Sequence, residues 1–211
     1  MANDSINRQV IDIKASAGVG DISNEVLRRW TDKGYEMAVK EGNYDRSREH
    51  LNFEIVKGGR IVPVDKTRPL DVRMAELLAE RGIRDPNIGR SNPNIRTAVK
   101  FVFGGSHDRM TELAFGNQEV DFEAKCGNDH IQRMPEIEKW AQDIYNFVAR
   151  KFGEETSSTL WCILMKPQPM LTVALCQSTT RAESAIRMCS MVTPSLSTSS
   201  SSHNYITSWQ K

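Results

Sequence analysis

The sequence predicts an α+β fold in which helices pack on an antiparallel sheet. Two observations support this prediction: amphipathic segments of helical period are interspersed with short apolar runs, and two of those runs flank a Gly-Gly turn, which is a hairpin signature. At 211 residues, the chain is long enough to bury a substantial core.

The first half of the chain supplies one helix and the hairpin. SNEVLRRWTDKGYEMAVKE (23–41) spaces its apolar residues as a helix does, with Ser23 and Asn24 as candidate N-caps and a break near Gly34. HLNFEIV (50–56) alternates apolar and polar residues, and the Gly-Gly turn then leads into RIVPV (60–64). We therefore expect two antiparallel strands here.

Three more helices and one strand follow. Apolar residues recur at intervals of three or four residues over 70–81 and again over 135–153, which predicts a helix in each range. TAVKFVFGG (97–105) is typical of a strand, and SHDRMTELAF (106–115) of a helix capped by its first serine. The apolar stripe of the last helix needs a sheet to cover it.

The composition changes after residue 155. Residues 1–155 carry 24 basic and 26 acidic side chains, whereas residues 156–211 carry four and one, and 20 of these 56 residues are Ser or Thr. The apolar run TLWCILM is cut by Pro167 and Pro169, and SLSTSSSSHN is typical of a flexible tail. We expect a domain over 1–155 that lacks a sheet strand, followed by an irregular or disordered tail over 156–211.

The chain's overall charge and its cysteines exclude little. The net charge of +1 argues neither for nor against a nucleic-acid partner. No apolar run is long enough for a membrane span and the N-terminal residues do not resemble a signal peptide, so we expect a cytoplasmic protein with no membrane partner. The cysteines have no metal-ligand spacing, so no zinc site is expected.

Four segments of residues 1–155 carry a family resemblance. They are NYDRSREHLNFEIV, PLDVRMAELLAERGIRDPN, FVFGGSHDRMTELAFGNQ and RMPEIEKWAQDIYNFVARKFGEE. Together they resemble the Mob/Pre family of plasmid mobilisation relaxases, also called plasmid recombination enzymes, in particular the type found on Bacteroides mobilisable elements. The resemblance implies a relaxase/Rep-like (HUH-type) domain.

The resemblance also implies an activity and partners. Family members cut one DNA strand at an origin of transfer through a covalent protein-phosphodiester link, and a divalent metal, Mn²⁺ or Mg²⁺, polarises the scissile phosphate. The implied partner is single-stranded or hairpin origin-of-transfer DNA, together with other mobilisation or conjugation proteins.

The candidate site residues come mainly from one motif. The pattern N-x-D-x-x-R-x-H-L-N-[FY]-E implies DNA-binding roles for five residues here: Asn43, Asp45, Arg48, His50 and Asn52. Arg28 joins them, because Arg28 or Arg29 is what remains of an H-N-x-R pattern near the start of many family members. That pattern's nucleophilic histidine is absent, which leaves Tyr35, Tyr44 and His50 as plausible local nucleophiles, and we take Tyr44 and His50 as the catalytic candidates. The alternation of residues 50–56 equally suits a half-buried strand with a structural histidine.

The family's metal-binding motif, H-x-D-E-x-x-P-H-x-H, is absent from this chain. No two of its four histidines lie within ten residues of each other, so no local metal triad exists and we predict that the chain holds no metal and is inactive. The alternatives are a non-catalytic DNA-binding or partner-binding module and an inert fragment.

A net loss of one nucleotide near the codons of Glu155 and Thr156 would explain both the missing motif and the altered composition. The genetic code then requires Val in place of Cys162 and Glu in place of Lys166 in the original frame. It permits His at three positions: Ile163, Met170 and Thr172. The hidden line is compatible with V-H-L-D-E-T-x-[TA]-H-V-H, which resembles the family motif.

Overall fold

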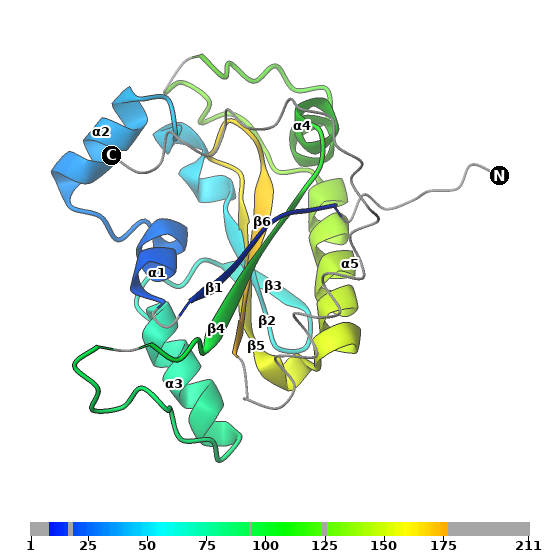
Figure 1. Cartoon of the computed structure of the whole chain (residues 1–211). Coiled ribbons are helices and arrows are strands. Elements are labelled where there is room, and N and C mark those ends of the chain that lie inside the picture. Colours follow the sequence, from blue (N-terminus) through cyan, green and yellow to red (C-terminus); the bar gives the residue numbers. More distant parts are fainter. Residues whose placement is uncertain (1–8, 17–18, 93, 124–125, 177–211) are drawn as a thin grey trace, which may run out of the picture. The chain divides into compact units, whose positions relative to one another are not determined.

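Six antiparallel strands form the sheet, in the order β1-β4-β6-β5-β2-β3 (Figure 1). The computed structural model describes residues 9–16, 19–92, 94–123 and 126–176. The strands are β1 (Gln9–Ser16), β2 (Phe53–Val56), β3 (Arg60–Pro63), β4 (Ala98–Gly104), β5 (Ser157–Ile163) and β6 (Met170–Cys176). The predicted α+β class with an antiparallel sheet is confirmed.

Helices cover both faces of this sheet. One face carries α1 (Gly20–Leu27), α2 (Asp32–Lys40) and α3 (Leu70–Glu80), and the other carries α4 (His107–Phe115) and α5 (Pro135–Phe152) (Figure 1). Alternate strand residues point to opposite faces. The core under α1 and α3 therefore includes Trp161, Ile163 and Ala174, which are fully or almost fully buried.

The predicted helix over 23–41 is two helices. α1 begins at Gly20 and ends at Leu27, because the C-cap residue Arg28 has a left-handed φ of 55°. Thr31 then starts α2, and its hydroxyl accepts a hydrogen bond from the amide of Gly34, which lies inside the second helix instead of at the break.

The first predicted hairpin strand is shorter than expected, because a 3-10 helix, η1 (Arg46–Leu51), precedes it. The Asp45 side chain accepts a hydrogen bond from the amide of Ser47 and caps η1. His50 therefore lies on η1, and the strand begins only at Phe53.

The prediction that residues after 155 supply no strand is wrong for residues 157–176. After the 3-10 turn η2 (Glu154–Thr156), β5 and β6 form the middle of the sheet, and Pro167 and Pro169 lie in the turn between them. Both strands are buried on both faces, so their sequences are nearly continuous apolar runs and do not alternate between apolar and polar residues. They also cover the stripe of α5, and the domain boundary expected at 155 falls inside the sheet unit.

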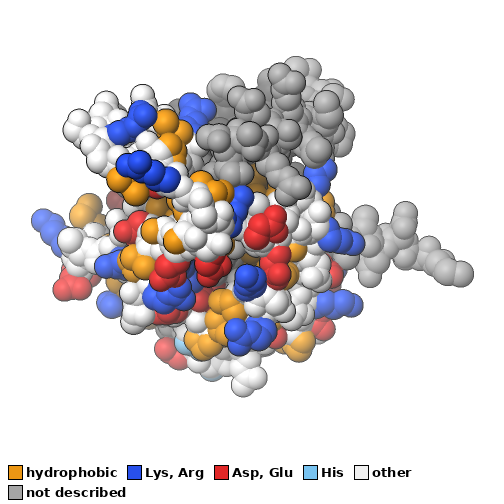
Figure 2. Space-filling model, turned by 90° about the horizontal axis from the view of Figure 1, so that it is seen from below, with side chains coloured by type: hydrophobic (Ala, Val, Ile, Leu, Met, Phe, Trp, Pro, Cys, Tyr) orange, Lys and Arg blue, Asp and Glu red, His pale blue; other side chains and the backbone are white. Residues whose placement is uncertain are grey.

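Residues 177–211, which include the serine-rich part of the predicted tail, lie outside the described residues. In the part of the chain that is described, no helix combines the length and the apolar character that crossing a bilayer requires. Figure 2 shows basic and acidic side chains interspersed on one face, so that face gives no electrostatic indication of a partner.

Candidate functional site

A group of charged and aromatic residues lies where α1 meets the turn between β5 and β6. We call Glu25, Arg28, Tyr44 and Lys166 the Tyr44 cluster. The Arg28 guanidinium lies 4.2 Å from the centre of the Tyr44 ring and Lys166 Nζ lies 5.5 Å from it, both within cation-π range. Lys166 Nζ also donates to Glu25 Oε1 at 2.7 Å. The cluster thus joins α1, the segment before η1 and the β5–β6 turn.

Arg28 is fixed by its position at the end of α1. Its Nε donates to Met165 Sδ at 3.2 Å, and its Nη1 donates to the carbonyl of Glu25. Carbonyls at a helix C-terminus carry partial negative charge, which favours a cation there. The guanidinium is therefore aimed at the turn, across the Tyr44 ring.

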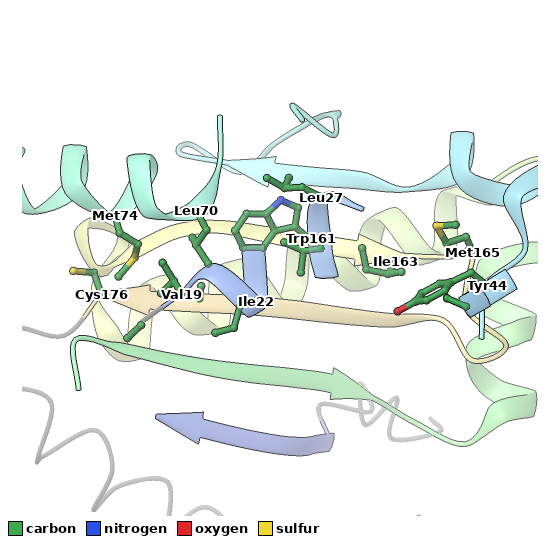
Figure 3. Close-up of a cluster of buried hydrophobic side chains, with 14 of the residues drawn as sticks. Val19, Ile22, Leu27, Tyr44, Leu70, Met74, Trp161, Ile163, Met165 and Cys176 are labelled. Atoms are coloured by element: carbon green, nitrogen blue, oxygen red, sulfur yellow. The ribbon is translucent and has the colours of Figure 1, made fainter. Parts of the chain in front are cut away.

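Tyr44 is a buried aromatic residue, 2% exposed. Burial, opposed in part by the nearby Arg28 guanidinium, raises the pKa of its hydroxyl to about 12. In Figure 3 the ring lies beside Met165 and its hydroxyl points back along the sheet towards Ile163. Because the phenolate is scarce at neutral pH, this environment does not activate Tyr44 as a nucleophile.

Asp45, which caps η1, and Arg48, which lies on η1, form a buried hydrogen-bond network. Asp45 Oδ2 accepts from Arg48 Nε at 2.8 Å and from Asn128 Nδ2 at 2.7 Å, and Asp45 Oδ1 accepts from the Ser47 amide at 2.9 Å. Burial tends to raise the pKa of the Asp45 carboxyl, but the hydrogen bonds from Ser47, Asn128 and Arg48 outweigh it and lower the pKa. At 3% and 1% exposure, Asp45 and Arg48 are internal and hold the loop in shape.

Asn52 also has an internal role, because its Oδ1 accepts from the amides of Leu164 and Met165 at 2.7 and 3.2 Å. The motif loop is thereby tied to the end of β5. The exposed His50 lies on the other side of the loop, where its Nε2 is 3.4 Å from the carbonyl oxygen of Ile131. Asn43 is half-buried and donates to Glu41.

The structure thus separates the predicted site residues into two groups. Arg28 and Tyr44 are brought together, whereas Asp45, Arg48 and Asn52 are enclosed in the protein, away from any surface that a ligand could reach in this conformation.

The sheet face under α1 brings together the three positions that the alternative reading frame permits to be histidine. Ile163 pairs with Met170 across β5 and β6, and Thr172 is two residues further along the same face of β6. Lys166, where the original frame requires glutamate, lies in the turn that joins these strands.

These side chains do not fit a divalent metal. Mn²⁺ and Mg²⁺ take imidazole and carboxylate ligands, but the three positions carry isoleucine, methionine and threonine. Among the described residues there is also no group of three or more His, Cys, Asp and Glu side chains that could hold a metal ion. No catalytic step through a metal can be derived for the residues present.

Three contributors to the site were missed at the sequence level. Lys166 was assigned to the tail, and Met165 is 137 residues away from Arg28 in sequence. Glu25 could have been found, because its spacing of three from Arg28 places both on one face of a helix.

The antiparallel sheet with helices on both faces is similar in fold to solved relaxase domains. Solved structures with this fold include the relaxase domain of MobM, a MOBV or Mob_Pre protein, bound to oriT DNA of plasmid pMV158 and to Mn. One, at pH 5.5, is 13% identical with a TM-score of 0.50, over 81% of this chain and 73% of that domain. Another, with a 3′-thiophosphate at pH 6.8, is 12% identical with a TM-score of 0.51, over 81% and 74%.

Family models and curated proteins give no match to the chain. At 11–13% identity, the likeness to the solved domains concerns the fold.

Proposed function

We propose that this chain is a plasmid mobilisation protein of Mob/Pre type that binds single-stranded or hairpin origin-of-transfer DNA. The observation that carries the proposal is the fold, which is shared with the solved domains over 81% of this chain. The solved domains with this fold are bound to oriT DNA. Arg28, Asn43 and His50 are the motif-derived residues whose partial exposure suits direct contact with DNA.

The proposal includes a lost active centre. Three positions that permit histidine in the alternative frame lie together under α1, and Lys166, which would be glutamate in that frame, lies in the turn between them. This convergence supports the loss of one nucleotide near the Glu155 codon. The chain as it stands would then bind DNA without cutting it, because the described residues bring no group of three or more His, Cys, Asp and Glu side chains together to hold a metal ion.

DNA binding is tested with fluorescein-labelled oligonucleotides of one length in single-stranded, hairpin and duplex form. We expect tighter binding of the single-stranded or hairpin form, with an affinity that falls as salt increases and is the same in EDTA as in Mn²⁺. Equal, weak binding of all three forms would count against the proposal.

Cleavage is tested separately. The 211-residue chain should give no covalent protein-DNA adduct with Mn²⁺. A gene with one nucleotide restored near the Glu155 codon should encode V-H-L-D-E, and its product should bind Mn²⁺. Adduct formation by the unrestored chain would refute the inactive assignment.

The second candidate function is a module that holds the full-length relaxase without binding DNA. Metal-independent binding of the relaxase, in the absence of any oligonucleotide binding, would favour it.

A further inference from the structure

The loop between α3 and β4 presents three arginine side chains to solvent. Arg84, Arg90 and Arg96 are all exposed, and Figure 1 shows this loop extending away from the sheet beside α3. Among the described residues, none of the three forms an ion pair with a carboxylate. By contrast, the exposed Arg68 pairs with Glu76. The loop is therefore a basic surface whose arginines are available to an outside partner.

Asn87 gives this loop a fixed shape. It is 9% exposed, its Nδ2 donates to the carbonyl of Ile95 at 2.7 Å, and its Oδ1 accepts from the amide of Ile95 at 3.2 Å. Asp85, the one acidic residue of 84–96, accepts from the Asn87 amide through Oδ1 at 2.8 Å. Because these bonds close the loop before a partner binds, less conformational entropy is lost on binding.

The closed part of the loop carries an exposed apolar residue. Ile88 is 62% exposed, and Arg90 Nη1 donates to Asn94 Oδ1 at 3.0 Å within the same part. Arg84 and Arg96 lie outside the closing bonds in sequence, one on either side. Arginines around an apolar side chain are typical of protein segments that enter the minor groove of duplex DNA.

The loop lies at the end of the sheet opposite the proposed lost centre. Ala98, where β4 begins, pairs with Cys176 at the end of β6, and Arg81 Nη1 donates to the Cys176 carbonyl at 3.5 Å. The lost centre lies at the other end of β6, where Met170 pairs with Ile163. At about 3.3 Å per residue, the two ends of β6 are about 20 Å apart. This is the rise of about six base pairs of duplex DNA.

We propose that residues 84–92 and 94–96 form a second DNA contact, in which Arg84, Arg90 and Arg96 bind the duplex stem of a hairpin. This inference rests on the proposed binding of origin-of-transfer DNA and adds that the stem is held at a surface separate from the lost centre. Three unpaired arginines beside one internally bonded carboxylate favour a polyanion such as DNA. An acidic surface of a protein is the competing partner, and the test distinguishes the two.

The test measures fluorescence anisotropy with three labelled oligonucleotides: a single strand, a hairpin with a stem of about four base pairs and a hairpin with a stem of about ten, which is long enough to reach the loop. The loop variant combines Arg84→Gln, Arg90→Gln and Arg96→Gln. For the long stem, we expect it to bind more weakly and to lower the slope of log K against log salt by about three, since about one is lost with each phosphate contact. Its binding of the short stem and the single strand should match that of the wild type.

The matched control combines Arg109→Gln, Lys139→Gln and Arg150→Gln. It removes the same charge from exposed positions of α4 and α5, on the other face of the sheet. Because all six substituted side chains are exposed, both variants should have the Tm of the wild type. The control should bind the long stem as the wild type does.

A loss that is confined to the long stem and to the loop variant supports the proposal. Equal losses for the long and short stems, or in both triple variants, overturn it and leave the proposed binding of origin DNA standing. If the wild type binds no DNA, both proposals fail. Unchanged binding of the long stem by the loop variant also overturns the inference, and a loss of self-association in sedimentation would then assign the loop to an interface between protein chains.

Discussion

Replacing Arg73 by methionine tests whether the segment after residue 155 belongs to the folded core. Arg73 Nη1 donates to Glu54 Oε1 at 3.2 Å and to Thr159 Oγ1 at 3.0 Å, and Trp161 Nε1 donates to Glu54 Oε2 at 3.1 Å. The ion-pair side chains of Arg73 and Glu54 are 5% and 2% exposed. This network joins α3, β2 and β5 inside the protein.

The expected loss follows from what the substitution leaves behind. Without Arg73, Glu54 is a buried carboxylate that keeps a hydrogen bond from Trp161, and breaking a buried pair in this way costs about 3–5 kcal/mol. The carbonyls of Arg68 and Asp65, which accept from Arg73 at 2.8 Å each, also lose a donor. We therefore expect Arg73→Met to lower the free energy of unfolding by about 3–5 kcal/mol.

The assay is urea unfolding followed by tryptophan fluorescence, with the slope m compared between variants. Arg68→Met is the control, because Arg68 pairs with Glu76 at the surface, where both side chains are about half exposed, and should cost at most about 1 kcal/mol. Adding Glu54→Leu to Arg73→Met should recover part of the loss. A loss below about 1 kcal/mol for Arg73→Met would refute the buried network, and with it the place of β5 beside β2.

Three further predictions concern the same fold. A chain of residues 1–177 should unfold cooperatively, whereas 1–155, which lacks the two central strands, should show no cooperative transition by circular dichroism; cooperative unfolding of 1–155 would contradict the sheet order. The pKa of the Asp45 carboxyl is lower in the folded protein than in the unfolded chain, where it is about 4. The ionised carboxylate therefore stabilises the fold at pH values above the unfolded pKa, and this stabilisation is lost as the pH falls through the folded pKa. Asp45→Asn should therefore reduce Tm at pH 7 and flatten its acid dependence between about pH 2 and 5, and an unchanged profile would contradict this. In a Cys189→Ser background, maleimide should label the exposed Cys126 before the fully buried Cys162, whose thiol pKa is raised by burial, and equal rates would place Cys162 at the surface.

The sequence alone predicted those elements whose periodicity directly reflects burial. The helix over 135–153 carries a stripe of apolar residues and ends at Gly153 as expected. The hairpin turn at Gly58 and Gly59 also follows from the sequence, since both residues have positive φ there. These features depend on neighbours close in the chain.

The central strands were missed because a strand buried on both faces has no alternation to detect. Thr159, Leu160 and Trp161 have the composition of a short apolar run, and only their register against Glu54 and Thr172 identifies them as β5. The charge imbalance of residues 156–211 therefore predicted a tail where the structure has the middle of the sheet.

The motif that suggested DNA binding was recognised by residue type, but residue type does not determine exposure. The sequence placed Asp45, Arg48 and Asn52 in one pattern, and the tertiary structure turned them inward, where the desolvation of their polar groups is compensated by hydrogen bonds to Asn128 and to the end of β5. Conversely, Lys166 comes beside Glu25 and Tyr44 only when the β5–β6 turn reaches α1. The sequence determined which charged and aromatic side chains are available. The tertiary structure decided which of them share one buried cluster, because contacts between residues more than a hundred positions apart leave no local pattern in the sequence.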